Sequence, residues 1–230
     1  MARPTASTAA STRRWRRRGN TRPSPISPNA GSDDARRRET TGERLTMPMP
    51  GMRGMEHIGF TVPNIDEACE FFERILGAET LFTAATNFRV DDSDWMAEHL
   101  RVHPRAVVKE FRYMRCGNGT NLEVFEYEAP DQAQTPPKNS DIGGHHLAFY
   151  VDDMDAAIAF LKENGVEVLG EPTSYTEGPN IGLTWCYFMA PWGLQLEIVS
   201  APNGTVYDNE AKTSGKTRLF HPKFPKETAI

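Results

Sequence analysis

The sequence predicts an α+β protein built from two copies of a βαβββ module. The first observation behind this prediction is an internal repeat, in which residues 55–62 (MEHIGFTV) correspond to residues 144–151 (GHHLAFYV). The second is that residues 121–124 (NLEV) correspond to residues 194–198 (LQLEI) at the end of each copy. The third is that strand-like and helix-like spacings follow one another in the same order in both copies, as expected for a duplicated unit.

The first module is expected to span residues 55–128. Residues 57–62 alternate apolar and polar side chains, which is typical of a strand with one buried face. A helix follows, capped by Asn64 or Asp66, and ends before Gly77, because glycine readily adopts the left-handed conformation found just after helices. The other predicted elements are strands over residues 79–84, 107–115 and 121–127, and a short helix near residues 94–100 within an insertion.

The second module is expected to span residues 143–200, after a polar, proline-bearing linker over residues 129–142. Its helix is capped by Asp152 or Asp153 and ends before Gly165. The predicted strands cover residues 146–151, 166–169, 183–189 and 194–200, with a polar loop over residues 172–181. The order of elements is therefore the same in both modules.

The two ends of the chain differ from the modules in composition. Residues 1–50 contain 11 Arg against 4 Asp plus Glu, a charge of +7, so the whole-chain charge of −5 leaves −12 for the remainder. Such a stretch buries too little apolar surface to fold, and we expect a disordered extension. An over-long start assignment, with the natural start at Met47, Met52 or Met55, is one interpretation, and a transit peptide or a nucleic-acid-binding arm is the alternative. Residues 201–230 are expected to form a polar tail that either lies on the surface or packs over a partner subunit or the mouth of the site.

Composition also limits the partners of the folded part. Its acidic charge argues against nucleic acid. No apolar run approaches the roughly 20 residues of a membrane helix, so no membrane partner is expected. The three cysteines, Cys69, Cys116 and Cys186, show no CxxC spacing and favour a reducing compartment, the cytoplasm, over a disulfide framework.

A histidine and a glutamate recur at equivalent places in the two modules. His57 and His146 lie on the first predicted strands, and Glu123 and Glu197 lie on the last. Imidazole nitrogen and carboxylate oxygen are ligands that Zn, Mn, Fe, Co and Ni accept. Because two copies of the pair make a set of four, the sequence predicts a metal-binding enzyme.

The histidine of the second module is preceded by another histidine, His145. Alignment of residues 57–62 on residues 146–151 places His146, and not His145, in register with His57. Strand parity agrees, because His146 lies opposite the apolar face of its strand. We therefore expect His146 to be the ligand, and His145 to point away from the site or to line its edge.

These residues together resemble the vicinal oxygen chelate superfamily, which includes glyoxalase I, methylmalonyl-CoA epimerase, extradiol dioxygenases and bleomycin or fosfomycin resistance proteins. The resemblance covers roughly residues 55–200. It implies that the two modules pair into a cupped mixed sheet around one divalent metal ion, and that the chain forms a homodimer, as paired modules in this family commonly do. Carried over by position, the metal ligands are His57, Glu123, His146 and Glu197.

The chemistry implied by this resemblance is proton transfer next to a metal-bound carbonyl of a small-molecule substrate. Glu123 and Glu197 could act from opposite faces of the substrate, which is the arrangement that an epimerase needs. The leading hypothesis is a divalent-metal-dependent isomerase that resembles the epimerases of the family and acts on an acyl-CoA or a polyol ketone. The alternatives are a lactoylglutathione lyase (glyoxalase I)-like enzyme, an extradiol-type dioxygenase and a non-enzymatic resistance-type binding protein. Glu123 argues against the dioxygenase, whose iron site uses two His and one Glu.

Further residues on the predicted strands could line the cup by their position. They are Tyr150, Tyr187, Phe125, Trp185 and Arg112. Aromatic residues on such strands are more often part of the core than of a substrate site.

Overall fold

The computed structural model describes residues 49–220 apart from Ala85 and Asp91. The description below concerns residues 53–220 of this range, which belong to one compact unit. The expected disordered extension over residues 1–50 lies outside the described residues except for its last two positions. No helix in the described part is long and apolar enough to cross a bilayer.

The first module forms a four-stranded sheet in the order β1-β4-β3-β2. β1 is parallel to β4, and the other neighbours are antiparallel. The elements lie close to the predicted ranges, so the first βαβββ module is confirmed. They are β1 (His57–Thr61), α1 (Ile65–Leu76), β2 (Glu79–Ala84), α2 (Trp95–Leu100), β3 (Val107–Arg115) and β4 (Asn121–Glu128).

The second module repeats this topology in the order β5-β8-β7-β6. Its elements are β5 (Leu147–Tyr150), α3 (Met154–Glu163), β6 (Val168–Ser174), β7 (Thr184–Met189) and β8 (Gln195–Ser200). β6 continues to Ser174, where the sequence predicted a loop. The register of β6 against β7 shifts between Leu169 and Thr173, so the strand passes Gly170 and Pro172 as an irregularity and then resumes pairing.

The first helix shows how local sequence sets the boundaries of an element. The Asn64 side chain accepts hydrogen bonds from the backbone N–H groups of Asp66 and Glu67, at 3.0 and 3.1 Å. Gly77 adopts a left-handed conformation (φ 63°) that ends the helix. Both ends therefore lie where the caps predict them.

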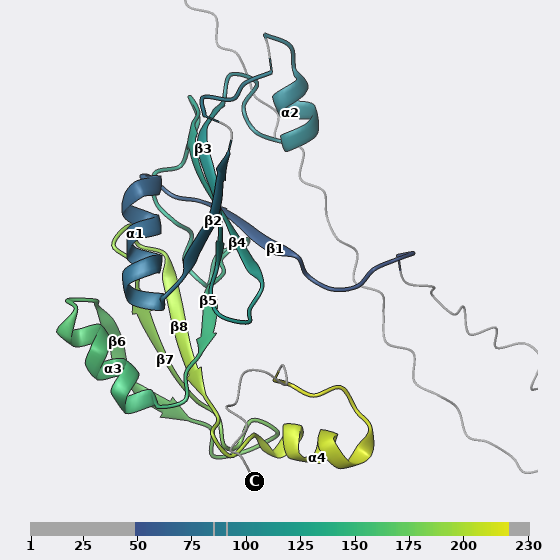
Figure 1. Cartoon of the computed structure of the whole chain (residues 1–230), viewed down its shortest axis with the longest axis vertical. Helices are drawn as coiled ribbons and strands as arrows, with labels where there is room; N and C mark the ends of the chain where they lie inside the picture. Colours follow the sequence, from purple (N-terminus) through teal and green to yellow (C-terminus); the bar gives the residue numbers. More distant parts are fainter. Residues whose placement is uncertain (1–48, 85, 91, 221–230) are drawn as a thin grey trace, which may run out of the picture. The chain divides into compact units, whose positions relative to one another are not determined.

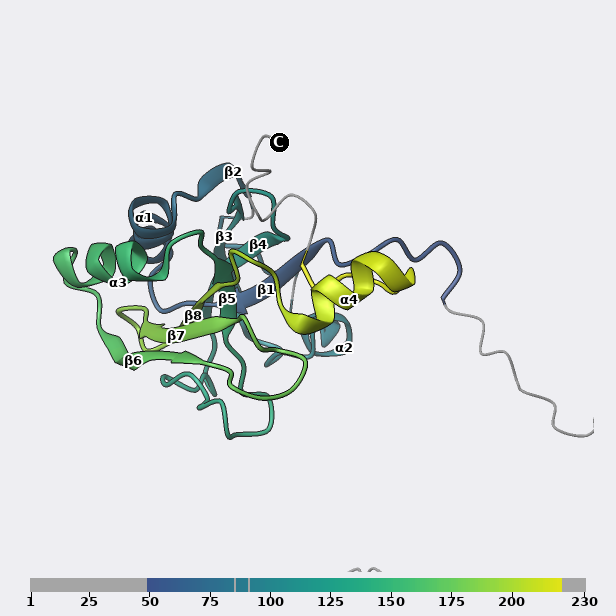
Figure 2. The same ribbon diagram turned by 90° about the horizontal axis from the view of Figure 1, so that it is seen from below.

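The two modules share one hydrophobic core beneath their helices. Phe72 of α1 is fully buried and contacts Trp192, in the turn between β7 and β8, with ring centroids 5.7 Å apart. Arg74 of α1 donates a hydrogen bond to Asn164, which follows α3, at 3.1 Å. α1 and α3 lie on one side of the sheets, and the opposite face of each sheet is left uncovered by these two helices (Figures 1 and 2).

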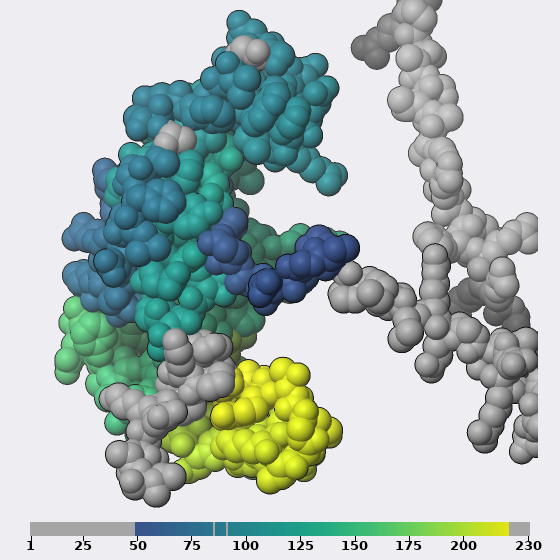
Figure 3. Space-filling view, turned by 45° about the vertical axis from the view of Figure 1, so that its right-hand side comes forward, coloured from purple at the N-terminus to yellow at the C-terminus, as the bar shows by residue number. Residues whose placement is uncertain are grey.

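The C-terminal segment contains a helix that the sequence analysis missed. α4 (Val206–Ser214) begins at Thr205, whose hydroxyl accepts a hydrogen bond from the Asp208 N–H at 3.0 Å, and it ends at Gly215 (φ 72°). The sequence predicted only a polar tail over residues 201–230 and gave no indication of this helix. The helix escaped prediction because it has almost no apolar face: the residues it buries are Asp208 and Ala211. It forms a distinct lobe on the surface (Figure 3).

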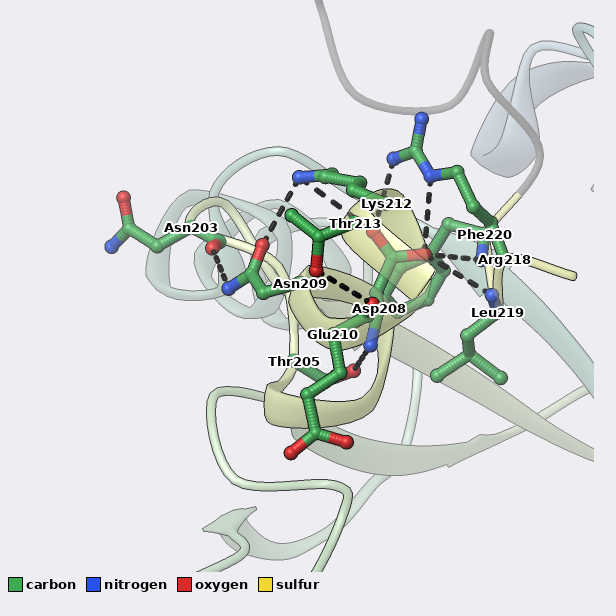
Figure 4. Close-up of polar contacts among 10 residues, drawn as sticks. All are labelled: Asn203, Thr205, Asp208, Asn209, Glu210, Lys212, Thr213, Arg218, Leu219 and Phe220. Atoms are coloured by element: carbon green, nitrogen blue, oxygen red, sulfur yellow. Dashed lines mark hydrogen bonds and ion pairs between the residues drawn. The ribbon is translucent and has the colours of Figure 1, made fainter. Parts of the chain in front are cut away.

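Asp208 connects α4 to the chain that follows it (Figure 4). Its carboxylate is 1% exposed and accepts hydrogen bonds from the Arg218 guanidinium at 3.0 and 3.4 Å. It also accepts bonds from the backbone N–H groups of Leu219 and Phe220, at 3.1 and 3.4 Å, and Lys212 lies 3.7 Å away. A carboxylate with several donors is satisfied even where water is excluded.

These contacts make the stability of the C-terminal segment dependent on pH. Burial alone would raise the pKa of Asp208, but the donors from Arg218 and the Phe220 N–H hold it below its usual value of 3.8. A lowered carboxyl pKa stabilises the fold above the unfolded-state value, and this stabilisation is lost as pH falls through the folded-state value. We therefore expect Asp208→Asn to melt at a lower temperature than wild type at pH 7, with the gap closing below about pH 3.8. Thermal melts across pH 2.5–8 test this, and a gap independent of pH would contradict it.

Candidate active site

The first His–Glu pair lies on the sheet face opposite α1. Leu122 and Val124 of β4 are buried in the core, so Glu123 between them points to the other face, next to His57 at the start of β1. His57 Nε2 lies 3.2 Å from Glu123 Oε2. The other ring nitrogen of His57 contacts the Glu56 carboxylate and the Tyr113 hydroxyl, the latter at 3.2 Å.

The second pair repeats this arrangement. His146 Nε2 lies 3.0 Å from Glu197 Oε2, and Glu197 is only 9% exposed. Leu196 and Ile198 of β8 are buried in the core, so Glu197 also faces away from it. Both glutamates therefore lie on the face of their sheet that points away from the core, next to a histidine.

A tyrosine accompanies each pair, and one of the two was missed in the sequence. Tyr113 of β3 stands in register with Glu123, and its ring lies edge-on to His57, with centroids 5.6 Å apart. Tyr187 of β7 stands in register with Glu197, and its ring lies edge-on to His146 at 5.2 Å. The Tyr187 position was predicted to line the cup. Tyr113 could have been identified in the same way, because each tyrosine lies ten residues before the glutamate of its own module.

The electrostatics of each pair come from within its own module. The hydrogen bond with Glu56 raises the pKa of His57, and the charge of Glu123 adds to this. Burial raises the pKa of Glu197, while His146 opposes the shift. Burial, with a neighbouring glutamate, also raises the pKa of Tyr113 and of Tyr187.

The structure brings the four predicted ligands together as two pairs. Within residues 49–220, no group of three or more His, Cys, Asp or Glu side chains is arranged to hold a metal ion. Each pair supplies the imidazole and carboxylate donors that first-row divalent ions accept, but only two of them. A four-ligand site made of His57, Glu123, His146 and Glu197 therefore stays a prediction.

Two other sequence-based expectations concern side chains near the pairs. His145 does not contact Glu197; its Nδ1 lies 3.1 Å from the carbonyl oxygen of Gly143. Arg112 does not line the face that carries the pairs. Its guanidinium binds Asp66 of α1 and Glu110, on the helix side of the sheet, so this expectation was wrong. Arg112 and Tyr113 are consecutive residues of β3, so their side chains point to opposite faces of the sheet.

A cavity of about 810 Å³ adjoins the first pair. Gly59 lines it, and a Cβ atom on Gly59 would lie 3.3 Å from Glu123 Oε2. Aromatic and hydrogen-bonding side chains lie around it, including Thr61, His103, Tyr127, His145 and Trp192. None of the four predicted ligands lines the cavity itself, so it is a space beside the first pair and not around it.

The two adjacent histidines give a direct test of the strand register. His146→Ala removes the imidazole that contacts Glu197, whereas His145→Ala removes an imidazole that contacts the backbone carbonyl of Gly143. We expect His146→Ala to weaken binding of Mn²⁺ or Zn²⁺ by at least about 10-fold and His145→Ala to change it by less than about 3-fold. Isothermal titration of the metal-free protein measures both. The reverse order of effects would show that the register is wrong.

Comparisons with known proteins agree with this fold. The sequence profile of the glyoxalase/bleomycin resistance protein/dioxygenase superfamily matches residues 56–207. A 2-epi-5-epi-valiolone epimerase from Actinomyces sp is 42% identical over 176 residues, which cover 76% of this chain and 92% of that protein. A crystal structure of a glyoxalase family protein from Bacillus cereus is 20% identical and superposes with a TM-score of 0.52, over 67% of this chain and 97% of that one. The chain therefore belongs to the glyoxalase/bleomycin resistance/dioxygenase superfamily.

Proposed function

We propose that this protein is a divalent-metal-dependent epimerase that acts on a polyhydroxylated ketone. The observation that carries this proposal is that each module holds a glutamate against a histidine, at 3.2 and 3.0 Å, in the same place on the same face. The arrangement supplies two groups that can transfer protons. The 42% identity to a protein named for a valiolone epimerase favours a polyol ketone over an acyl-CoA.

The reaction needs one base and one acid on opposite faces of the substrate. Glu123 removes the proton next to the carbonyl, and the electron pair of the broken C–H bond moves to the carbonyl oxygen. Glu197, protonated, returns a proton to the same carbon from the other face, and the electron pair moves back from the oxygen to form the new C–H bond and restore the carbonyl. The configuration inverts, no electron leaves the substrate, and the two glutamates exchange roles in the reverse direction.

The four donors fit a divalent ion in chemistry, because His nitrogen and Glu oxygen are shared by Zn, Mn, Fe, Co and Ni sites. His57, Glu123, His146 and Glu197 would hold it. When bound, the ion polarises the carbonyl oxygen and lowers the cost of removing the neighbouring proton. Since one chain presents these donors as two pairs, we propose that a second copy of the chain brings the second pair against the first.

Exposed apolar side chains on the first sheet support this homodimer. Phe82 is 50% exposed, and its ring stacks on Tyr113 at 4.8 Å, next to His57. Phe111 and Phe125 extend the same set of rings, with centroids 5.3 Å apart. Aromatic clusters on an uncovered sheet face are typical of protein or ligand interfaces.

Complementation between variants tests the shared site. His57→Ala and His146→Ala are each expected to be inactive alone. If the site is shared between copies, a mixed dimer has one site with both histidines intact, so mixing restores roughly a quarter of wild-type activity after random exchange. If both pairs meet within one chain, mixing restores nothing.

The reaction class is tested by solvent isotope exchange. With Mn²⁺ or Zn²⁺ and 2-epi-5-epi-valiolone in D₂O, we expect deuterium at the carbon next to the carbonyl, without oxygen uptake. Oxygen consumption with a catechol and Fe²⁺ would favour a dioxygenase instead. Turnover of the hemithioacetal of glutathione would favour a lactoylglutathione lyase. Binding of the ketone without exchange would favour a binding protein.

A further inference from the structure

The chain beyond β8 returns to the face that carries the second His–Glu pair. Leu147 and Phe149 of β5 pack against the core, so Tyr150 points to the opposite face, the face of His146 and Glu197. α4 lies on this side of the molecule, away from α1 and α3, in both ribbon views (Figures 1 and 2). The C-terminal segment is therefore placed to contact the substrate face.

Phe220 makes that contact. Its ring lies edge-on to Tyr150, with centroids 5.3 Å apart, and the residue is only 8% exposed. The Tyr150 hydroxyl accepts a hydrogen bond from the backbone N–H of Ala201 at 3.4 Å, so the partner of Phe220 is itself fixed. Together the two rings form an aromatic edge on this face of the sheet.

The position of this edge relative to Glu197 follows from the strand register. Ala148 of β5 pairs with Glu197, and Tyr150 pairs with Val199. Two residues along a strand span about 7 Å. The Tyr150 ring leans further in the same direction, because its hydroxyl reaches the backbone N–H of Ala201. The Tyr150–Phe220 pair therefore stands at least about 7 Å along the sheet from Glu197, on the same face.

The edge is held in place and is not a loose end of the chain. The Asp208 carboxylate binds the backbone N–H groups of Leu219 and Phe220 and the side chain of Arg218 (Figure 4). Tyr207 of α4 donates a further hydrogen bond to the carbonyl oxygen of Thr217 at 2.9 Å. These bonds fix the backbone immediately before and at Phe220.

We propose that Phe220 is a specificity-determining residue that closes one end of the substrate site, and that Asp208 is the positioning residue that holds it there. The wall admits a compact single-ring ketone, whose C–H edge packs on the Phe220 ring. It excludes ketones that carry a bulky group at that end. This inference rests on the proposed function for its substrate, and it extends beyond the matched family profile, which ends at residue 207.

Phe220→Ala tests the wall with two substrates. The compact ketone is 2-epi-5-epi-valiolone, and the extended one is its benzyl ether at a ring hydroxyl. We expect KM for the compact ketone to rise about 10-fold with kcat within about 3-fold, because a packing contact is lost and no reacting group moves. We expect kcat/KM for the benzyl ether to rise at least about 10-fold relative to the compact ketone. Equal changes for both substrates, or none, would overturn the proposal.

Asp208→Asn tests the positioning role. The amide keeps the size of the carboxylate but loses its charge, so the backbone at Phe220 is held less firmly. We expect kcat/KM to shift toward the benzyl ether as it does for Phe220→Ala, but by a smaller factor. The double variant should show no larger shift in this preference than Phe220→Ala alone. Thr213→Ala, on the exposed side of α4, is the matched control and should leave both substrates unaffected. A preference unchanged in Asp208→Asn would show that Asp208 only stabilises the fold.

Two measurements keep this test separate from the proposed function. Melting temperatures show whether each variant is folded, and Phe220→Leu, which keeps much of the apolar volume, replaces Phe220→Ala if the latter unfolds. If wild type exchanges no proton, the proposed reaction fails, but the wall is still tested by binding. Both ketones are then titrated against the fluorescence of Trp185, which faces the same side as Tyr187. Equal affinity of wild type for both ketones would refute the wall.

Discussion

Glu123→Gln and Glu197→Gln are each expected to lower kcat by about two to four orders of magnitude, the usual contribution of a group that transfers a proton in the rate-determining step. Glutamine has the size of glutamate and can still accept a hydrogen bond, but it cannot take up a proton. The two side chains contact His57 and His146 at 3.2 and 3.0 Å, so an amide of the same shape leaves the surrounding packing intact.

The two variants should also differ in what they still do. In D₂O, a variant that lacks the returning acid still removes the proton and exchanges it on one face of the substrate, without inversion. A variant that lacks the removing base does neither. We therefore expect one variant to exchange deuterium without epimerisation in a given direction of reaction, and the other to do so in the reverse direction.

Glu128→Gln is the matched control for these variants. Glu128 lies at the exposed end of β4, on the strand that carries Glu123. Its replacement should change kcat by less than about 2-fold. A mechanism with two bases would be contradicted if both glutamate variants lost deuterium exchange and epimerisation in equal proportion, in both directions of the reaction.

Much of the fold could be predicted because each signal in the sequence acts locally. Asn64 and Gly77 fix the ends of α1 through backbone hydrogen bonds and a left-handed residue, and neither depends on the rest of the chain. The alternation of apolar and polar residues along a strand determines which face of the sheet each side chain points to. For this reason the orientation of Glu123 and Glu197 away from the core followed from the residues on either side of them.

Other features depend on contacts that no local pattern contains. The face of Arg112 was misjudged because it depends on the pairing of β3 with β4, in which Arg112 stands opposite Val124 on the core side of the sheet. α4 was missed because Asp208 stabilises it through donors 10 to 12 residues further along the chain, in place of an apolar stripe. The separation of the ligands into two pairs is a property of how two modules pack, and a repeat in the sequence contains no information about it.

Phe72→Ala is expected to destabilise the protein by about 3–5 kcal/mol, the range for removing a fully buried phenylalanine. Phe72 is 0% exposed, and its ring meets Phe60 and Phe71 at 5.9 Å and Trp192 at 5.7 Å. These neighbours belong to β1, α1 and the turn between β7 and β8. Since they are fixed by different elements, they cannot collapse together into the space that the ring leaves.

The effect should reach the second pair as well as the first. Phe72 and Phe71 of α1 both contact Trp192, which lies just before the strand that carries Glu197. Loss of the Phe72 ring therefore loosens the contact through which the first module supports the second. Chemical denaturation gives the loss of stability, and Phe160→Ala on α3 is the control, because Phe160 is 43% exposed and should cost less than about 1 kcal/mol. If the two variants lost similar stability, the shared core would not be what holds the modules together. If Phe72→Ala unfolds, Phe72→Leu is measured in its place. Its loss of stability should be less than half of that expected for Phe72→Ala, because leucine fills much of the same volume.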